Sequence, residues 1–198
     1  LAEAMEKRAE SGHDILYLLQ DMQDFELYGT VRAVVSVCDS MNYVTEPEEL
    51  EYVIALVNNY LDPGGLFIFD MNTIHKYRDV IGDRTIAEDR EDGSFIWENS
   101  YDSENALNVY ELALFLPRED GLYEKCEEEH VQKAYSIEEV KVMIAKAGME
   151  LVAVYDAYTH TPGDENCERL TFIAREHGKS AENDYHGNIP ERARHTEE

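Results

Sequence analysis

The chain has 198 residues, of which 43% are hydrophobic, so it can form one domain that carries a small insert. This composition excludes a wholly disordered protein, and a core of this size needs no disulfide or metal for its stability. Acidic residues outnumber basic ones by 43 to 17, which gives a formal charge of -26. Such a surface repels phosphate backbones and anionic lipids, so we expect neither nucleic acid nor a membrane as a partner.

The spacing of cysteine and histidine residues bears on disulfide bonds and metal sites. The three cysteines, Cys38, Cys126 and Cys167, lie far apart, which excludes a disulfide framework and favours a reducing cytoplasm. No histidine pairs with another histidine or with a cysteine at ligand spacing, so we expect no metal site. The chain starts without methionine inside an expected helix, and we expect it to begin part-way into a longer protein.

Residues 1–38 predict a helix followed by two strands. Residues 1–11 place small apolar and charged side chains at helical spacing, and Gly12 is suited to end that helix. The short apolar run at residues 15–19 predicts a strand. Residues 31–38 are β-branched on both faces, which is typical of a parallel strand that is buried on both sides.

The clearest helix comes next. Thr45 and Glu48 have the spacing of a capping box, and Pro47 suits the first turn. Apolar residues then recur at helical spacing until the Asp-Pro-Gly-Gly turn at residues 62–65 ends the helix. Residues 66–70 predict a second buried strand, so this part of the chain forms a βαβ unit.

The middle of the chain predicts an antiparallel meander. Four β-rich runs, at residues 85–88, 95–101, 106–116 and 122–131, are separated by short loops rich in Gly, Asp, Glu and Asn. We therefore expect residues 77–133 to form an inserted β subdomain.

The α/β pattern then resumes and ends in a polar tail. Ser136 and Glu139 predict a second capping box and a helix. Residues 150–155 and 169–174 predict the last two strands. Hydrophobic residues nearly vanish near the end, so we expect a disordered tail over residues 178–198.

Three segments at strand ends carry a resemblance to a known family: Gln20-Asp21-Met22, Cys38 to Tyr43, and Leu61-Asp62-Pro63-Gly64-Gly65. In this order, residues 1–177 resemble the later part of a class I S-adenosylmethionine-dependent methyltransferase of the small bacterial type with a β-rich insert. The resemblance implies an α/β fold with a Rossmann-like, mostly parallel sheet and helices on both faces. Residues 1–76 and 134–177 would form this core, incomplete at its N-terminus.

The glycine-rich loop of that family (E/D-x-G-x-G-x-G), which wraps the methionine part of the cofactor, does not occur in the 198 residues. The acidic residue that ends the family's second strand and holds the ribose is also missing. Both belong to strands in the middle of the family's sheet. We therefore expect a truncated core with a gap in its sheet, in preference to a rearranged fold.

The resemblance implies S-adenosyl-L-methionine as the cofactor and assigns its adenine to Gln20, Asp21 and Met22. Asp21 would accept a hydrogen bond from the adenine amino group, and Met22 would cover the ring. The alternative for Asp21 is a loop carboxylate that caps its own turn.

The resemblance places the loop from Cys38 to Tyr43 between the sulfonium methyl group and the acceptor, where in-line geometry supplies most of the acceleration. Asp39 could orient or deprotonate the acceptor, and Tyr43 could offer a ring face to the sulfonium. Asp39 and Tyr43 are therefore the candidate catalytic residues, and the resemblance implies that they bind the cofactor together with Cys38 and Ser40. The alternatives are a turn over residues 39–42 and a buried, structural Cys38.

Polar residues that follow the later strands are candidates for binding the acceptor: Asn42, Asp70, Asn72, His130 and Tyr135. A turn is the alternative at Asp70, and a surface strand of alternating charge explains His130 equally well. The acidic run at residues 127–129 is interpreted as a solvated face. Trp97 and Tyr110 are interpreted as packing residues.

The resemblance thus implies methyl transfer to a small-molecule acceptor that carries an amine, hydroxyl, carboxylate or thiol. Two other functions stay open. One is a non-catalytic methyltransferase-like binding or scaffold protein. The other is a hydrolase with Cys38 or Ser40 as the nucleophile, although the Gly-x-Ser-x-Gly elbow of such enzymes is missing. The oligomeric state is not indicated.

Overall fold

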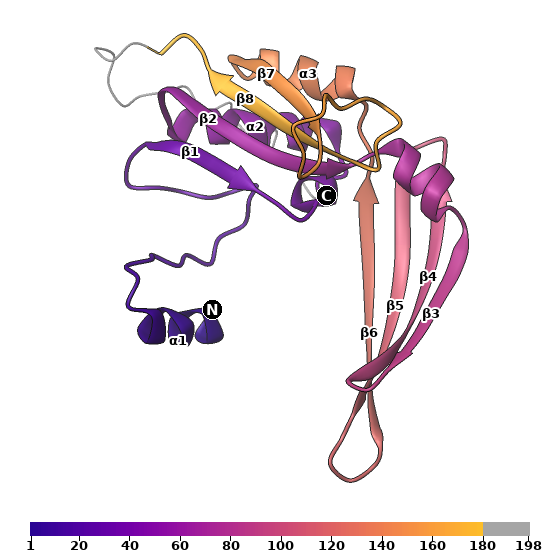
Figure 1. Cartoon of the computed structure of the whole chain (residues 1–198). Helices are drawn as coiled ribbons and strands as arrows, with labels where there is room; N and C mark the ends of the chain where they lie inside the picture. Colours follow the sequence, from indigo (N-terminus) through magenta and orange to yellow (C-terminus); the bar gives the residue numbers. More distant parts are fainter. Residues whose placement is uncertain (180–198) are drawn as a thin grey trace, which may run out of the picture.

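The computed structural model describes residues 1–179 and contains two four-stranded sheets (Figure 1). The first sheet has the order β1-β2-β8-β7 and the second the order β3-β4-β5-β6. The elements are α1 (Ala2–Ser11), β1 (Val31–Ser36), the 3₁₀ turn η1 (Ser40–Tyr43), α2 (Pro47–Tyr60), β2 (Leu61–Asn72), the π-helical turn η2 (Lys76–Ile81), β3 (Arg84–Arg90), β4 (Gly93–Asp102), β5 (Leu107–Pro117), β6 (Tyr123–Lys133), α3 (Ile137–Lys146), β7 (Met149–Asp156) and β8 (Arg169–Glu176). The α/β fold class and the meander are confirmed.

The first sheet is mixed and carries the core. β1 and β2 are parallel, whereas β8 runs antiparallel to both β2 and β7. Helices α2 and α3 share one core cluster with β2 and β8, so they cover the same face of the sheet. Within residues 1–179 the sheet is therefore mixed rather than mostly parallel, and helices cover one face rather than the expected two. Phe69 stacks between Phe67 and Phe172, with ring centroids 4.5 and 5.1 Å apart. All three rings are fully buried.

The strand predicted at residues 15–19 does not form, and that prediction is wrong. Leu16 and Leu19 are 72% and 85% exposed, and no neighbouring strand supplies backbone partners, without which a lone strand is not stable. The strands of the first sheet are hydrogen-bonded neighbours throughout, so the expected gap is not present within residues 1–179 and that prediction is wrong; β1 is an edge strand of this sheet. Helix α1 forms as predicted, has no buried residue and lies apart from the sheet (Figure 1).

The two predicted capping boxes have different outcomes. At α3 the Ser136 hydroxyl accepts from the backbone of Glu139, whose carboxylate accepts from the backbone of Ser136, so this box is confirmed. The prediction of a capping box at Thr45 and Glu48 is wrong, because α2 starts at Pro47 and Glu46 is its N-cap. Proline favours the first helical position, and the cap therefore lies one residue later than the spacing suggested.

The second sheet is an antiparallel meander whose root packs against the first sheet. Its register places Tyr110 opposite both Asn99 and His130. At the root, Tyr77 and Ile81 of η2 pack with Trp97 in a small second core. The far end of the meander extends away from the rest of the molecule (Figure 1).

The start of the predicted tail is tied to the core. Lys179 donates from its ammonium group to the Leu61 carbonyl at 2.7 Å, beside the end of α2, where a cation satisfies free carbonyl groups. The rest of the predicted disordered tail, residues 180–198, lies outside the described residues. No helix within residues 1–179 is long and apolar enough to cross a membrane.

Candidate active site

The carboxyl ends of β1 and β2 meet the start of β8 and the root of β6. Because β1 and β2 are parallel, the residues that follow them lie at one edge of the sheet. Because β8 is antiparallel to β2, its first residue, Arg169, pairs with Asn72 at that same edge. Residues from four distant parts of the sequence therefore converge at one place.

Arg169 holds the two strand tips together. Its guanidinium donates to Asp39 Oδ1 at 2.6 Å and to Asp70 Oδ2 at 3.0 Å. The second oxygen of Asp39 accepts from Gln132 Nε2 at 2.7 Å, and the Asp39 amide donates to Asp70 Oδ1 at 2.8 Å. Both carboxylate oxygens of Asp39 are therefore engaged, which favours a role in positioning the loop over that of a free base.

The backbone of this loop is held in an uncommon conformation. Cys38 and Asp39 have φ values of 62° and 51°, a left-handed region that costs free energy for residues other than glycine. The turn leaves Cys38 exposed, and the Ser40 hydroxyl donates to the Val37 carbonyl at 2.8 Å. Among the hydrogen bonds of residues 1–179, none joins a histidine to the Cys38 thiol or the Ser40 hydroxyl.

Three predicted acceptor-binding residues are buried supports of the site. Asn42 exchanges two hydrogen bonds with the backbone of Asn72, at 3.1 and 2.8 Å, and donates to the Lys133 carbonyl at 2.8 Å. The Asn72 amide donates to the Tyr77 hydroxyl. The Tyr135 hydroxyl donates to the Val44 carbonyl at 2.6 Å, and burial raises the pKa of Tyr135. Direct binding of an acceptor by Asn42, Asn72 or Tyr135 stays a prediction.

Tyr43 and His130 form an aromatic and polar cluster with two further residues of the meander. The Tyr43 hydroxyl lies 2.8 Å from His130 Nδ1 and 3.2 Å from the Tyr110 hydroxyl. His130 stacks on Tyr110 with ring centroids 4.5 Å apart, and its Nε2 lies 3.1 Å from a carboxylate oxygen of Glu128. Tyr43 itself is 41% exposed, so a ligand has access to it.

The adenine-binding candidates lie in the loop before β1. Gln20 exchanges hydrogen bonds with the backbone of Glu26, and Asp21 Oδ1 accepts from the Gln23 amide at 2.9 Å. Met22 packs against the main core. Asp21 therefore makes the turn that its alternative interpretation describes, and its second oxygen has no partner within residues 1–179.

Sequence reasoning missed three residues of the site: Arg169, Gln132 and Tyr158. Gln132 lies two residues after His130, and this same-face spacing was the available signal. Arg169 is 130 residues from Asp39, and nothing local marks it. Tyr158, from the β7–β8 loop, donates to Asp70 Oδ2 at 3.1 Å, and this hydrogen bond raises the pKa of Tyr158.

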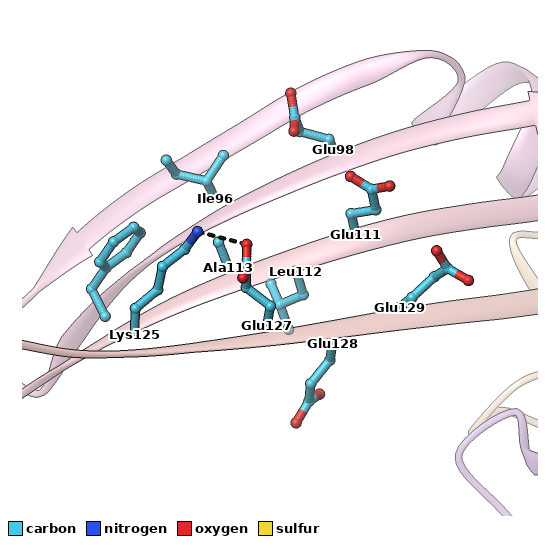
Figure 2. A pocket seen from close by; sticks show the side chains of 10 residues that line it. Ile96, Glu98, Glu111, Leu112, Ala113, Lys125, Glu127, Glu128 and Glu129 are labelled. Atoms are coloured by element: carbon cyan, nitrogen blue, oxygen red, sulfur yellow. Dashed lines mark hydrogen bonds and ion pairs between the residues drawn. The ribbon is translucent and has the colours of Figure 1, made fainter.

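An open groove of about 520 Å³ lies on the other face of the meander (Figure 2). Its lining mixes apolar and charged side chains, and Glu98, Glu111 and Glu129 form one row across β4, β5 and β6. Figure 2 shows Glu127 and Glu129 directed to this face and Glu128 directed away from it. In the described part of the chain, no cluster of three or more His, Cys, Asp or Glu side chains could hold a metal ion.

Comparisons with known proteins agree with this geometry. The chain is 30% identical over 171 residues to "Putative methyltransferase YqeM" of Bacillus subtilis, and the match spans 86% of this chain and 69% of that protein. A crystal structure of an S-adenosylmethionine-dependent methyltransferase from Clostridium acetobutylicum superposes with a TM-score of 0.83 at 25% identity, over 89% of this chain and 71% of that one. The CcbJ methyltransferase from Streptomyces caelestis superposes with a TM-score of 0.76 at 16% identity, over 90% and 71% of the two chains. No protein-family model matches the chain.

The strand order, the polar strand tips and the inserted meander define the class I fold of S-adenosylmethionine-dependent methyltransferases. The chain belongs to the methyltransferase family that includes YqeM of Bacillus subtilis.

Proposed function

We propose that this protein transfers a methyl group from S-adenosylmethionine to a small-molecule acceptor. The acceptor would lie between η1 and the face of the meander that carries Tyr110 and His130. The observation that carries the proposal is the convergence of Asp39, Tyr43 and Asp70 at the carboxyl ends of β1 and β2, where open α/β sheets bind ligands. Tyr43 is exposed there, and the meander supplies His130 beside it.

The residues present fit the nucleoside part of the cofactor. Asp21 uses one oxygen for its own turn, and the other can accept from an adenine amino group. The exposed Val37 and Cys38 offer an apolar surface at the end of β1. When bound, S-adenosylmethionine supplies an electrophilic methyl group on a positively charged sulfur, and the carboxylates of this edge complement that charge.

The chain's own residues fix the positions of the reactants. The ion pairs of Arg169 with Asp39 and Asp70 lock the loop after β1 against the end of β2. Asn42 ties the same loop to the meander. A displacement reaction gains most from such fixed geometry, because it needs nucleophile, carbon and sulfur in line.

Binding of S-adenosylhomocysteine, measured by calorimetry on the full-length protein, tests the cofactor assignment. Asp21→Asn keeps the acceptor for the Gln23 amide but loses the charge, so we expect affinity to fall by about 10-fold. Asp24→Asn, three residues along in the same loop, is the matched control and should leave affinity unchanged. Absence of any heat with the folded wild-type protein would overturn the proposal.

Turnover separates the enzyme from the scaffold alternative. Full-length protein is incubated with radiolabelled S-adenosylmethionine and a panel of amines, alcohols, carboxylates and thiols, and methylated product is counted. We expect product with at least one acceptor class. Tight binding of S-adenosylhomocysteine with no product from any class would favour a non-catalytic binding protein.

A further inference from the structure

Four side chains beside the proposed acceptor site form one continuous row of hydrogen bonds. The row runs from Tyr110 through Tyr43 and His130 to Glu128, with distances of 3.2, 2.8 and 3.1 Å between successive polar atoms. Tyr43 comes from η1 after the first sheet, and the other three come from the meander. The acidic run at residues 127–129 thus has two different faces, and only Glu128 joins the site (Figure 2).

The direction of the hydrogen bonds follows from the chemistry of the groups. A carboxylate can only accept, so the neutral His130 ring carries its proton on Nε2 and donates it to Glu128. Nδ1 is then free to accept from the Tyr43 hydroxyl. Burial, followed by the hydrogen bond with Tyr43, raises the pKa of Tyr110, so Tyr110 stays protonated and donates to the Tyr43 oxygen.

We propose that Tyr43 is the catalytic residue that removes the acceptor's proton, and that His130 and Glu128 act through it as a proton relay. This inference rests on the proposed function. As the acceptor's nucleophilic atom bonds to the methyl carbon, the carbon–sulfur bond breaks and its electron pair stays on sulfur. The acceptor's proton passes to the Tyr43 oxygen, while the Tyr43 proton passes to His130 Nδ1. The resulting imidazolium is paired with Glu128 and later releases its proton to water.

The relay also indicates the class of acceptor. A base at this position is useful only if the nucleophilic atom carries a proton at neutral pH. Primary and secondary amines, alcohols and thiols meet this condition, whereas a carboxylate is already deprotonated. The relay therefore favours an amine, hydroxyl or thiol acceptor over a carboxylate.

The arrangement of His130 suits this role geometrically. The ring is held by stacking on Tyr110, by the edge contact with Tyr43 and by Glu128, so its orientation is fixed from three sides. The same logic of nucleophile, base and orienting carboxylate operates in hydrolytic triads. A purely structural role, in which the row only fastens η1 to the meander, is the competing explanation.

The position of the ring proton is the first test, and it needs no acceptor. The full-length protein is labelled with ¹⁵N-histidine, and the His130 signals are assigned with the His130→Gln variant. At a pH where the ring is neutral, we expect the proton on Nε2, with its signal lost in Glu128→Ala and retained in Glu129→Ala. A proton on Nδ1, or equal effects of the two variants, would overturn the relay.

Turnover with an acceptor from the panel is the second test. We expect kcat to fall about 100-fold in Tyr43→Phe and in His130→Gln, while KM and the affinity for S-adenosylhomocysteine stay unchanged. The double variant should be no more than about 3-fold slower than either single one, because the groups act as one unit. Glu128→Ala should lose about 10-fold in kcat, and Glu129→Ala no more than about 2-fold.

The results that would overturn the relay differ from those that would overturn the proposed function. Multiplicative losses in the double variant, or losses in KM alone, would show a fastening role and overturn the relay. Absence of turnover with every acceptor would count against the enzyme proposal, whereas a ring proton on Nδ1 would overturn the relay alone. Thermal unfolding of each variant, followed by circular dichroism, verifies that it is folded.

Discussion

The two sheets of this protein differ in how they are packed. The first is covered by α2 and α3 and buries stacked phenylalanine rings, so it supplies the hydrophobic core. The meander has a small core only at its root, and β3 is exposed along its whole length. Its buried interior is partly polar, as in the reciprocal amide hydrogen bonds of Asn99 and Asn108 at 2.9 and 3.0 Å.

This difference in packing suggests that the two sheets contribute differently to stability and to activity. The helix-covered sheet sets the positions of Asp39, Asp70 and Arg169, and the meander brings Gln132 and His130 to them. We therefore expect substitutions in the first sheet to act mainly on the free energy of unfolding. Those at the root of the meander should act on activity.

The largest expected loss in the free energy of unfolding comes from a substitution in the core of the first sheet. Phe69→Ala removes the middle ring of the stack and leaves a cavity, so we expect a loss of about 4 kcal/mol in the free energy of unfolding. Phe115→Ala, in the half-buried far part of the meander, should cost about 1 kcal/mol. Urea unfolding followed by circular dichroism measures both, and equal losses would contradict the contrast.

The ion pairs between the strand tips come next. Arg169→Met leaves Asp39 and Asp70 as neighbouring carboxylates with little solvent, so we expect a loss of about 3 kcal/mol. Adding Asp39→Asn and Asp70→Asn should recover most of it, and failure to recover would show that packing rather than charge is lost. Lys141→Met, which breaks the exposed pair with Glu138, is the control and should cost about 0.3 kcal/mol.

Helix capping gives a smaller effect that discriminates between α2 and α3. Ser136→Ala removes the reciprocal hydrogen bonds with Glu139, and we expect a loss of about 1 kcal/mol. Thr45→Ala should change stability by less than about 0.3 kcal/mol, because no capping bond is formed there. Thermal unfolding of both variants measures the difference.

The smallest expected effect is a gain in stability. Glu111 lies directly opposite Glu98 and Glu129, and like charges in cross-strand pairs repel. Glu111→Gln should stabilise the protein by about 0.5 kcal/mol at low salt. The gain should shrink in 1 M salt, which screens charges over a few ångströms. A gain that is independent of salt would point to another cause.

The sequence predicted elements that depend on local pattern. The β-branched run at residues 31–38, the capping box at Ser136 and the four runs of the meander all lie close to their observed strands or helix. Their signals need only neighbours within a few residues, such as alternation and caps. The failure at residues 15–19 has the opposite origin, since a strand depends on a partner that local sequence does not contain.

The site was predictable only in part for the same reason. The tips of β1 and β2 were marked by polar residues after apolar runs, and both lie where expected. Arg169 belongs to the site because β8 pairs with β2, which brings it to Asp70, 99 residues earlier in the chain, and no local pattern reveals this. Glu128 looked like one member of a solvated acidic run, although its two-residue spacing from His130 already places both on one face of a strand. Local sequence does not show that this face meets Tyr43 of η1.

The meander is joined covalently to the helix-covered part of the molecule by two short stretches of chain, residues 73–83 and 134–136. Tyr43 and His130 lie on opposite sides of this double crossing, 2.8 Å apart. Because a hydrogen bond is lost when its atoms separate by about 1 Å more, a slight swing of the meander breaks this contact while each sheet stays intact. The contact between Tyr43 and His130 therefore depends on the alignment of the two sheets, which the hydrogen bonds of Asn42 with Lys133 and of Asp39 with Gln132 hold in place.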